Sequence, residues 1–272
     1  MGLTERQEEL YKVLLAELHS MEHVLIAFSG GVDSSFLLHA ACKALGKSFL
    51  AVTFATPYSP KSEISSAIEL AGKARVRHSL IEKPFPDVLR ENPSERCYHC
   101  KKLLLGELVR IAETEGIGHI LDGSNLNDLD DHRPGRRAVN ELGVRSPLLD
   151  AGLTKQDIRD LSLEHNLPTW NKPAGACLLT RLPHGTIVDE QELERIDKGE
   201  DFLRSIGFTH VRLRSHGDMA RIEVPERSVA SCVHPTFRRR IDRFIKELGY
   251  RHVAVDLAGY EMGSLNDPSS KE

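Results

Sequence analysis

The sequence predicts an α/β fold in which a parallel β-sheet, covered by helices on both faces, is followed by a smaller α+β domain. Apolar strand-like runs alternate with helix-like runs from residue 23 onward, which is typical of parallel strands joined by helices. Beyond residue 186, a charged amphipathic run precedes two alternating strand-like runs that a short turn connects. A chain of 272 residues is long enough for two domains, which we place at residues 1–185 and 186–272.

The individual elements follow from hydrophobic periodicity and from Gly, Pro and capping residues. In the first domain we expect strands at residues 23–28, 48–56, 76–81 and 117–121, and helices at 4–21, 34–45, 62–73, 101–115 and 154–165. In the second domain we expect helices at 189–206 and 235–248, and strands at 210–214, 219–224 and 252–257. The first helix places Leu10, Val13, Leu14 and Leu18 on one side, and Thr154 is expected to cap the helix that follows it.

Composition narrows the class of protein. A formal net charge of −4 argues against bulk nucleic-acid binding. No apolar run approaches the roughly 18 residues that a membrane span needs, and the N-terminus lacks a signal-peptide core, so we expect a cytoplasmic protein without a membrane partner. In that compartment the five cysteines indicate thiols, metal ligands or catalytic groups rather than disulfides.

Residues 29–35 read Ser-Gly-Gly-Val-Asp-Ser-Ser and lie where a predicted strand gives way to a predicted helix. Glycines let backbone N–H groups approach phosphate oxygens, and the helix points its positive end at them. Hydroxyls supply further donors, and the aspartate can hold Mg²⁺ or cap the helix. This segment lacks the Gly-Lys-Ser/Thr ending of a Walker loop and resembles the pyrophosphate loop of the N-type ATP pyrophosphatases. The expected ATP-binding residues here are Ser29, Gly30, Gly31, Asp33, Ser34 and Ser35.

Two further segments are expected to border the nucleotide, because ligands of parallel sheets bind beyond the carboxyl ends of the strands. Thr53, near the end of the second strand, would approach the adenine and ribose. Asp122 and Ser124, after the fourth strand, would contact ATP. The same polar loop contains Arg133, which would offer a cation to a phosphate or carboxylate. The alternative is that this loop is only a solvated, charged connection.

Cysteines mark a second kind of chemistry. Cys97 and Cys100 have C-x-x-C spacing on an expected turn before a helix, which suits a metal or cluster and also a redox dithiol. Cys177 lies between Lys172 and Arg181 in a Pro- and Gly-rich loop, and a cationic setting favours thiolate chemistry or metal ligation. The alternative for this residue is a small buried cysteine.

In the second domain, Arg212 and Arg214 are two residues apart on one predicted strand. Side chains that alternate along a strand place both guanidinium groups on one face, where they could bind a phosphate. A solvated face is an equally good interpretation. Residues 238–240 are interpreted as the solvent side of their helix.

Taken together, these segments resemble the LarE family over nearly the whole chain. LarE proteins are ATP-dependent sulfur transferases of nickel-pincer nucleotide biosynthesis within the pyrophosphate-loop superfamily. The matching segments are residues 29–34, 96–101, 122–125, 132–135, 171–177, 181–186 and 211–214. The first segment is shared by many adenylating enzymes, whereas the ordered set is much more specific.

The resemblance implies a reaction in two stages. ATP, with Mg²⁺, would adenylate a carboxylate of pyridinium-3,5-biscarboxylic acid mononucleotide, and a sulfur nucleophile would then displace AMP to leave a thiocarboxylate. It also implies that Arg212, Arg214 and Arg133 bind the substrate phosphate, that Asp33 and Glu200 are metal positions, and that Lys101 and Arg181 act with the cysteines. The resemblance also implies a homo-oligomer, with a hexamer as the candidate.

The sulfur source has two forms in the family. Some members sacrifice one cysteine in the segment corresponding to residues 172–181, and others resemble carriers of a 4Fe-4S cluster held by three cysteines. This chain has alanine at position 176, and it has Cys97, Cys100 and Cys177, so the resemblance favours a cluster that sulfide or a sulfur donor refills. Cys42 and Cys232 are interpreted as structural.

Two other functions remain open from the sequence. The first is a pyrophosphate-loop tRNA thiolase or another adenylating enzyme, against which the acidic net charge and the lack of a long basic arm argue. The second is an adenine-nucleotide sensor that does not turn over ATP, in which the three cysteines would have no purpose.

Overall fold

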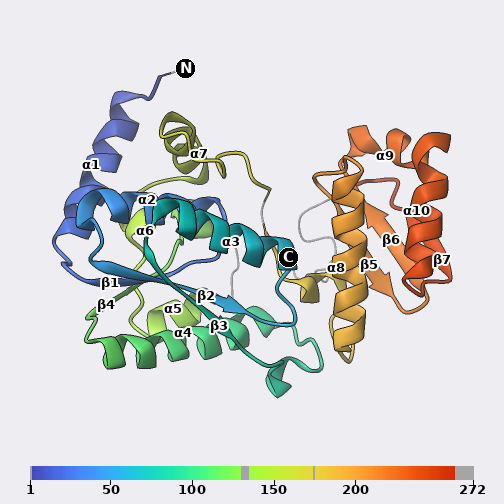
Figure 1. Cartoon of the computed structure of the whole chain (residues 1–272), viewed down its shortest axis with the longest axis horizontal. Coiled ribbons are helices and arrows are strands. Elements are labelled where there is room, and N and C mark those ends of the chain that lie inside the picture. The colour runs from blue at the N-terminus through green and yellow to red at the C-terminus, as the bar shows by residue number, and fades with distance from the viewer. Residues whose placement is uncertain (1, 130–134, 174, 261–272) are drawn as a thin grey trace. The chain divides into compact units, whose positions relative to one another are not determined.

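The computed structural model describes residues 2–129, 135–173 and 175–260, and it divides into two compact units (Figure 1). Unit 1 comprises Met1–Thr56, Lys61–Pro84 and Glu95–Gly175. Unit 2 comprises Pro57–Pro60, Phe85–Ser94 and Ala176–Glu272. The main division therefore lies between residues 175 and 176, whereas the sequence predicted it after residue 185, and two short earlier segments also join unit 2.

Unit 1 contains a four-stranded sheet in which every pairing is parallel. Its strands are β1 Val24–Ala27, β2 Phe49–Ala55, β3 Arg77–Glu82 and β4 His119–Leu121, in the order β3-β2-β1-β4. This arrangement confirms the predicted parallel sheet. Strand β1 lies between β2 and β4, and its apolar run does not alternate, as expected for a strand buried on both faces.

Helices cover both faces of this sheet (Figure 1). One face carries α1 Glu5–His19, α2 Val32–Leu45, α3 Lys61–Ala74, α6 Pro147–Asp150 and α7 Lys155–Glu164. The other face carries α4 Arg96–Glu115 and α5 Gly135–Glu141, and a short 3₁₀ turn, η2, spans Leu126–Leu129. The predicted apolar side of α1 is correct for Leu14 and Leu18, which are fully buried, but Val13 is 45% exposed.

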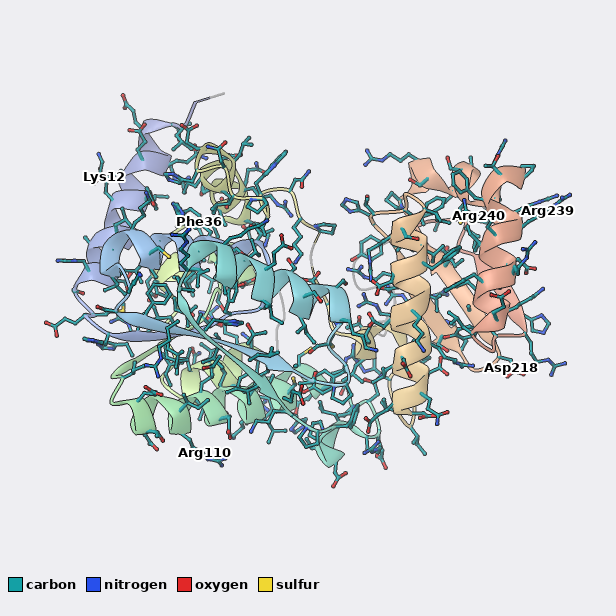
Figure 2. All side chains as sticks on the ribbon, in the orientation of Figure 1. Lys12, Phe36, Arg110, Asp218, Arg239 and Arg240 are labelled. Carbon is teal, nitrogen blue, oxygen red and sulfur yellow. The ribbon has the colours of Figure 1, made fainter. Side chains whose placement is uncertain are left out.

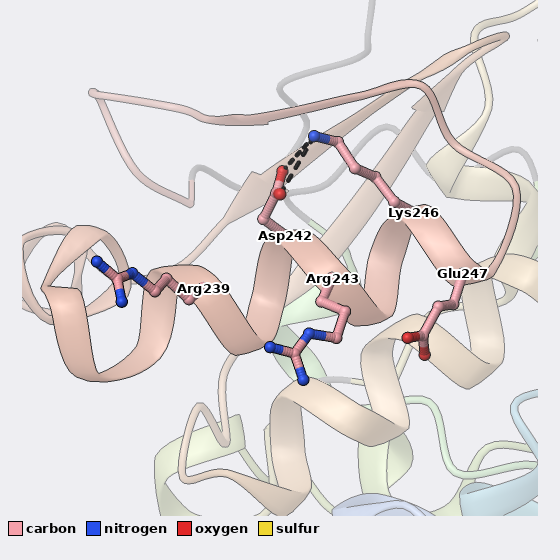
Figure 3. A pocket seen from close by; sticks show the side chains of 5 residues that line it. All are labelled: Arg239, Asp242, Arg243, Lys246 and Glu247. Atoms are coloured by element: carbon pink, nitrogen blue, oxygen red, sulfur yellow. Dashed lines mark hydrogen bonds and ion pairs between the residues drawn. The ribbon is translucent and has the colours of Figure 1, made fainter.

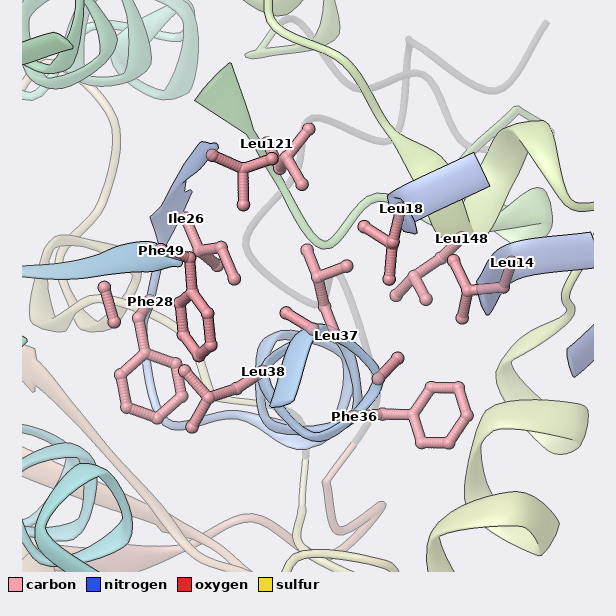
Figure 4. Packing of buried hydrophobic residues seen from close by; sticks show 14 of the residues in the cluster. Leu14, Leu18, Ile26, Phe28, Phe36, Leu37, Leu38, Phe49, Leu121 and Leu148 are labelled. Atoms are coloured by element: carbon pink, nitrogen blue, oxygen red, sulfur yellow. The ribbon is translucent and has the colours of Figure 1, made fainter. Parts of the chain in front are cut away.

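Helix α2 lies at the centre of the larger core, as Figure 4 shows. Phe36, Leu37 and Leu38 are consecutive and all buried, so the helix contacts apolar neighbours around most of its circumference. Figure 2 shows Phe36 pointing into unit 1, whereas Lys12 and Arg110 lie on the outside of that unit. Replacing one such leucine with alanine typically costs about 2–5 kcal/mol, so the core fixes this helix and the loop before it.

Helix α4 begins at Arg96, earlier than predicted. The sequence predicts Cys97 and Cys100 on a turn before a helix that starts at residue 101, and this prediction is wrong. The backbone carbonyl of Glu95 accepts hydrogen bonds from the N–H groups of Tyr98 and His99, so the helix is already formed there. Both cysteines therefore belong to its first turns.

Unit 2 combines a three-stranded sheet with helices, which agrees with the predicted α+β architecture. Strands β5 Arg212–His216 and β6 Met219–Glu223 are antiparallel, and β7 His252–Val255 is parallel to β6. The helices are α8 Glu190–Ser205, α9 Glu226–Val233 and α10 Pro235–Glu247, with 3₁₀ turns η1 Asp87–Leu89 and η3 Leu178–Arg181. Phe202 and Phe244 stack with ring centroids 4.0 Å apart and join α8 to α10.

The segment at residues 85–94 is tied to η3 within unit 2. Asn92 is completely buried, and its side-chain amide donates to the carbonyls of Leu182 at 3.1 Å and Pro183 at 2.9 Å. The N–H of Leu178 donates to the carbonyl of Tyr58 at 2.8 Å. Two segments from much earlier in the chain therefore hold the turn after Cys177 in place through hydrogen bonds. Within the described residues, no helix combines the length and apolar character that crossing a membrane requires.

Candidate active site

The order of the strands in unit 1 locates a crevice. After β1 the chain moves to β2 and β3 on one side, and it later returns to form β4 on the other side of β1. Loops that leave neighbouring strands in opposite directions open a crevice at their carboxyl ends, and α/β proteins bind ligands there. The loops that follow β1 and β4 meet here, since a Cβ added to Gly123 would lie 3.0 Å from the backbone nitrogen of Ser34.

The loop after β1 can only be built with glycine at residue 30. Gly30 has φ +70°, and a Cβ there would lie 2.9 Å from the Cα of Ala67 on α3. Gly31 is the N-cap of α2 and provides no side-chain hydrogen bond to the helix. Because the first N–H groups of a helix have no partner within it, this end of α2 presents donors and a positive dipole to an anion.

Two buried oxygens in the first turns of α2 lack hydrogen-bond partners among the described residues. They are Oδ1 of Asp33 and Oγ of Ser35. By contrast, Ser34 is used locally, because its hydroxyl lies 3.0 Å from that of Ser29 and shapes the loop. Since buried polar atoms are nearly always hydrogen-bonded, two unpartnered oxygens on one helix end indicate the place of a ligand or ion. Carboxylate and hydroxyl oxygens suit Mg²⁺, which usually keeps water and phosphate ligands as well.

Three lysines from separate segments surround the crevice, and each is paired with a carboxylate. The pairs are Lys101 with Asp122 at 3.0 Å, Lys155 with Asp33 at 2.6 Å, and Lys172 with Glu63 at 2.7 Å. Lys172 also donates to the carbonyl of Gly30 at 2.9 Å, so it contacts the glycine loop directly. The sequence predicts a role for Lys101 and indicates Lys172 only as a neighbour of Cys177. It does not indicate Lys155, because nothing local marks a lysine whose partner lies 122 residues away.

Asp122 forms a fixed wall of the crevice. Its carboxylate accepts hydrogen bonds from the hydroxyls of Ser124 and Ser146, both at 2.7 Å, in addition to Lys101. Burial alone would raise the pKa of Asp122, but Lys101 and the serine hydroxyls outweigh it and hold the pKa below its usual value. Asp122 therefore stays ionised and positions both Lys101 and Ser124.

Thr53, the remaining residue predicted to contact the nucleotide, is buried within the sheet. Its hydroxyl donates to the carbonyl of Phe28 at 2.6 Å and lies 2.9 Å from Nε2 of His78. In the described structure the Thr53 hydroxyl thus holds the end of β1 in place.

Cys97 and Cys100 lie on the first turns of α4 in unit 1, and neither forms a disulfide. Residues three apart lie on the same side of a helix, so this turn offers two sulfur ligands together. Tyr98 anchors the turn, because its hydroxyl donates to Glu141 of α5 at 2.9 Å and the Arg137 guanidinium lies 3.6 Å above its ring. Cys97 is exposed and Cys100 is half-buried.

Cys177 is half-buried, forms no disulfide and lies in unit 2, immediately before η3. Its carbonyl accepts a hydrogen bond from the Arg181 guanidinium at 3.0 Å. Arg181 is only 1% exposed, and it forms a two-pronged ion pair with the fully buried Glu200 at 2.8 and 3.0 Å. In this structure Arg181 therefore holds the turn that carries the cysteine.

Glu200, predicted as a metal position, has both carboxylate oxygens engaged. Besides Arg181, they accept hydrogen bonds from the N–H of Leu213 and from Arg204. Burial alone would raise the pKa of Glu200, but Arg181, Arg212 and the N–H of Leu213 together outweigh it and hold the pKa below its usual value. Any metal at Glu200 would have to displace one of these partners.

Arg212 and Arg214 both lie on β5 in unit 2. The Arg214 guanidinium bonds to Glu223 at 2.8 and 2.9 Å, and the Arg212 guanidinium lies 5.3 Å over the ring of Tyr260. Burial, and then the charge of Arg181, lowers the pKa of Arg212, so an anion would relieve the repulsion between these cations. Arg133 lies outside the described residues.

No described set of three His, Cys, Asp or Glu side chains forms a group that could hold a metal ion. Cys97 and Cys100 belong to unit 1 and Cys177 to unit 2, so a shared cluster stays a prediction. Cys42 and Cys232 are poor thiolates, since burial raises the pKa of Cys42, and that of Cys232 to about 11.

A shallow hollow on α10 is separate from the predicted residues. It is lined by Arg239, Asp242, Arg243, Lys246 and Glu247, and Figure 3 shows Asp242 paired with Lys246 there. Figure 2 shows Arg239 and Arg240 extending outward from the same helix. The hollow includes none of the predicted site residues, and residues 238–240 are all exposed, which confirms their interpretation as the solvent side of the helix.

Comparison with known proteins identifies the family, although no family model matches. The chain is 36% identical over 261 residues to the pyridinium-3,5-bisthiocarboxylic acid mononucleotide synthase of Lactiplantibacillus plantarum, covering 95% of this chain and 94% of that protein. The chain belongs to the LarE family. The resemblance inferred from the ordered motifs is thereby confirmed.

Other LarE-like relatives carry no stated function. A Synechocystis protein is 35% identical and covers 90% of this chain and 92% of its own length. A Methanocaldococcus jannaschii protein is 30% identical and covers 90% and 94%. The similarity in all three relatives extends across both units.

Proposed function

We propose that this LarE-family chain is an ATP-dependent sulfur transferase that adenylates a carboxylate of pyridinium-3,5-biscarboxylic acid mononucleotide and converts it to a thiocarboxylate. The product class is the one in the name of the Lactiplantibacillus relative. The observation that carries the ATP step is the glycine loop at the crevice, with unpartnered oxygens on Asp33 and Ser35 and three lysines around it.

In the first step, the residues of unit 1 bind the triphosphate and stabilise the leaving group. A substrate carboxylate oxygen attacks the α-phosphorus; the new O–P bond forms as the bond between the α- and β-phosphates breaks, and pyrophosphate departs. The N–H groups at the start of α2 and the ammonium groups of the lysines face the growing negative charge. Asp33 would hold Mg²⁺, which supplies charge neutralisation for the phosphates when it is bound.

In the second step, a sulfur nucleophile attacks the acyl carbon, and the bond to AMP breaks to give the thiocarboxylate and AMP. Cys97 and Cys100 fit the role of cluster ligands because neither forms a disulfide and both lie on one side of an anchored helix turn. Cys177 would be the third ligand, and a 4Fe-4S cluster would supply an open iron for sulfide when bound. Arg212 and Arg214 would bind the phosphate of the substrate.

The experiment that tests the ATP step is exchange of labelled pyrophosphate into ATP in the presence of the mononucleotide dicarboxylate. We expect substrate-dependent exchange by the wild-type chain and a loss of about 100-fold or more in Asp33→Asn, because a cation ligand to the transferring phosphates is removed. Asp87→Asn, a fully exposed carboxylate in unit 2, serves as the control and should exchange normally.

Absence of exchange in the wild-type chain with substrate present would overturn the adenylation step and favour a nucleotide sensor. Exchange that depends on tRNA rather than on the mononucleotide would support the thiolase interpretation instead.

A further inference from the structure

The ion pair between Lys155 and Asp33 differs from the other ion pairs at this end of unit 1. Nζ of Lys155 lies 2.6 Å from Oδ2 of Asp33, while Oδ1 of the same carboxylate is buried without a partner among the described residues. By contrast, Asp122 and Asp157 each use both oxygens in hydrogen bonds to neighbouring groups. Only one of the two carboxylate oxygens of Asp33 therefore has a hydrogen-bond partner among the described residues.

Several contacts hold the backbone of Lys155, whereas its side chain has a single described bond. Its N–H donates to Oδ1 of Asn127 at 2.8 Å, and the preceding Thr154 forms a capping box with Asp157. Asp157 is in turn held by Arg6 of α1 at 2.9 Å. The only described side-chain bond of Lys155 is to Asp33, and 32% of the side chain is exposed. The four-carbon side chain can thus move while its base stays in place.

A divalent cation and the Lys155 ammonium would compete for the same carboxylate. Mg²⁺ requires oxygen ligands at about 2.1 Å, and a second positive charge on the same carboxylate is strongly repelled at that range. When the cation binds Asp33, the ammonium is displaced but stays within a side-chain length of the start of α2. A lysine is a compact, mobile charge that suits phosphate oxygens.

We propose that Lys155 occupies two positions, pairing with Asp33 in the empty site and contacting the leaving pyrophosphate after a divalent cation takes Asp33. The inference rests on the proposed function, because it requires nucleotide binding at this loop. In the empty site Lys155 neutralises Asp33, and in the loaded site it adds a charge where pyrophosphate departs. Binding of the cation and binding of pyrophosphate thereby become coupled.

The test measures binding of Mn²⁺ alone and then of inorganic pyrophosphate in the presence of Mn²⁺, by titration calorimetry on the full chain. In Lys155→Met, Mn²⁺ should bind about tenfold more tightly, because its competitor is gone, and pyrophosphate should bind about tenfold more weakly, because one charge-assisted hydrogen bond is lost. The matched control is Lys73→Ala, which removes another lysine paired at 2.6 Å, with Glu69 on the exposed side of α3, and should change neither affinity.

Lys155→Gln provides a second variant that keeps a hydrogen-bond donor for Asp33 but no charge, and it should show the same opposite shifts in smaller measure. Thermal unfolding of each variant verifies that the chain is folded. If both affinities fall together, or if neither changes in either variant while the wild-type chain binds both ligands, Lys155 has only a structural role and the inference is overturned, whereas the proposed function stands. A wild-type chain that binds neither Mn²⁺ nor pyrophosphate overturns both.

Discussion

Arg181 is a buried charged residue that positions the turn carrying Cys177. Its guanidinium contacts the carbonyls of Ala176 and Cys177 on one side and the carboxylate of Glu200 on the other. The charge of Glu200 offsets the cost of burying Arg181, and loss of Arg181 would leave the fully buried Glu200 with only the partly exposed Arg204 as a cationic partner. The ion pair therefore holds the Cys177 turn together with the hydrogen bonds that Asn92 and Tyr58 form to it.

Removing one partner should be costly. We expect Arg181→Ala to lower the free energy of unfolding by about 3–5 kcal/mol, because Glu200 is left charged and buried. Urea denaturation measures the change. Lys198→Ala, which breaks an exposed pair with Glu194 at 3.1 Å, is the control and should cost less than about 1 kcal/mol. Similar losses in both variants would contradict the structural role of Arg181.

His39 adds a pH dependence at the residue scale. Its ring lies 4.7 Å from that of His165, and Nε2 of each ring is buried without a partner among the described residues. Burial, followed by the charges of His165 and Lys43, lowers the pKa of His39 to about 4. The unfolded chain, with an ordinary histidine pKa, binds more protons between pH 6.5 and 4, so stability is complete above this window and is lost as the pH falls through it.

His39→Leu should reduce this loss of stability on acidification. The measurement is the free energy of unfolding in urea at a pH of about 7 and a pH of about 5, compared between variant and wild type. His23→Leu, an exposed histidine of the same unit, should leave the wild-type difference unchanged. An unchanged pH dependence in His39→Leu would show that other groups cause it.

At the scale of elements, Cys97 and Cys100 lie on the first turns of α4, and α5 packs against these turns. Gly135 allows this approach, because a Cβ there would lie 3.0 Å from Cδ of Lys101 and 3.4 Å from the carbonyl of Cys97. The Tyr98 contacts with α5 add to the same packing. Because the turn is fixed by this packing, the two thiols are preorganised, and binding of a metal or cluster would cost little conformational entropy.

This placement supports a test of the proposed cluster. Protein purified without oxygen should contain about four irons per chain, with matching acid-labile sulfide, and Cys97→Ala, Cys100→Ala and Cys177→Ala should each lose most of both. Cys42→Ala should retain them. If reconstituted wild-type protein holds no iron and turnover leaves one cysteine lighter by the mass of H₂S, the sulfur comes from a sacrificed side chain.

The sequence predicted the long elements well and the short ones poorly. Helix α2 was expected at residues 34–45 and spans Val32–Leu45, because a long apolar run bounded by glycines is unambiguous. The short helices α5, α6 and α9 were missed, since four to eight residues are too few to show a helical period. Motif spacing singled out Asp33 and the cysteines as candidates, but it could not indicate Lys155 or the burial of Arg181, which depend on contacts distant in sequence.

At the scale of the whole molecule, the chain does not build its units from two consecutive stretches. Residues 57–60 and 85–94 leave unit 1 and complete unit 2 around η3. A fragment that begins at the predicted boundary of residue 186 would therefore lack Asn92, Tyr58 and the turn that carries Cys177. The two units are compact but depend on a single continuous chain.

The hydrogen bonds of the buried Asn92 also limit when residues 85–94 can complete their folding during translation. Its carbonyl partner Pro183 follows 91 residues later, so at roughly 5–20 residues per second the ribosome needs about 5–18 s before that partner exists. Throughout that interval the segment at residues 85–94 has been translated but cannot reach its final hydrogen bonds. The nascent chain thus passes through a stage in which nearly all of unit 1 has been translated while the buried side-chain amide of Asn92 still lacks its partners in unit 2.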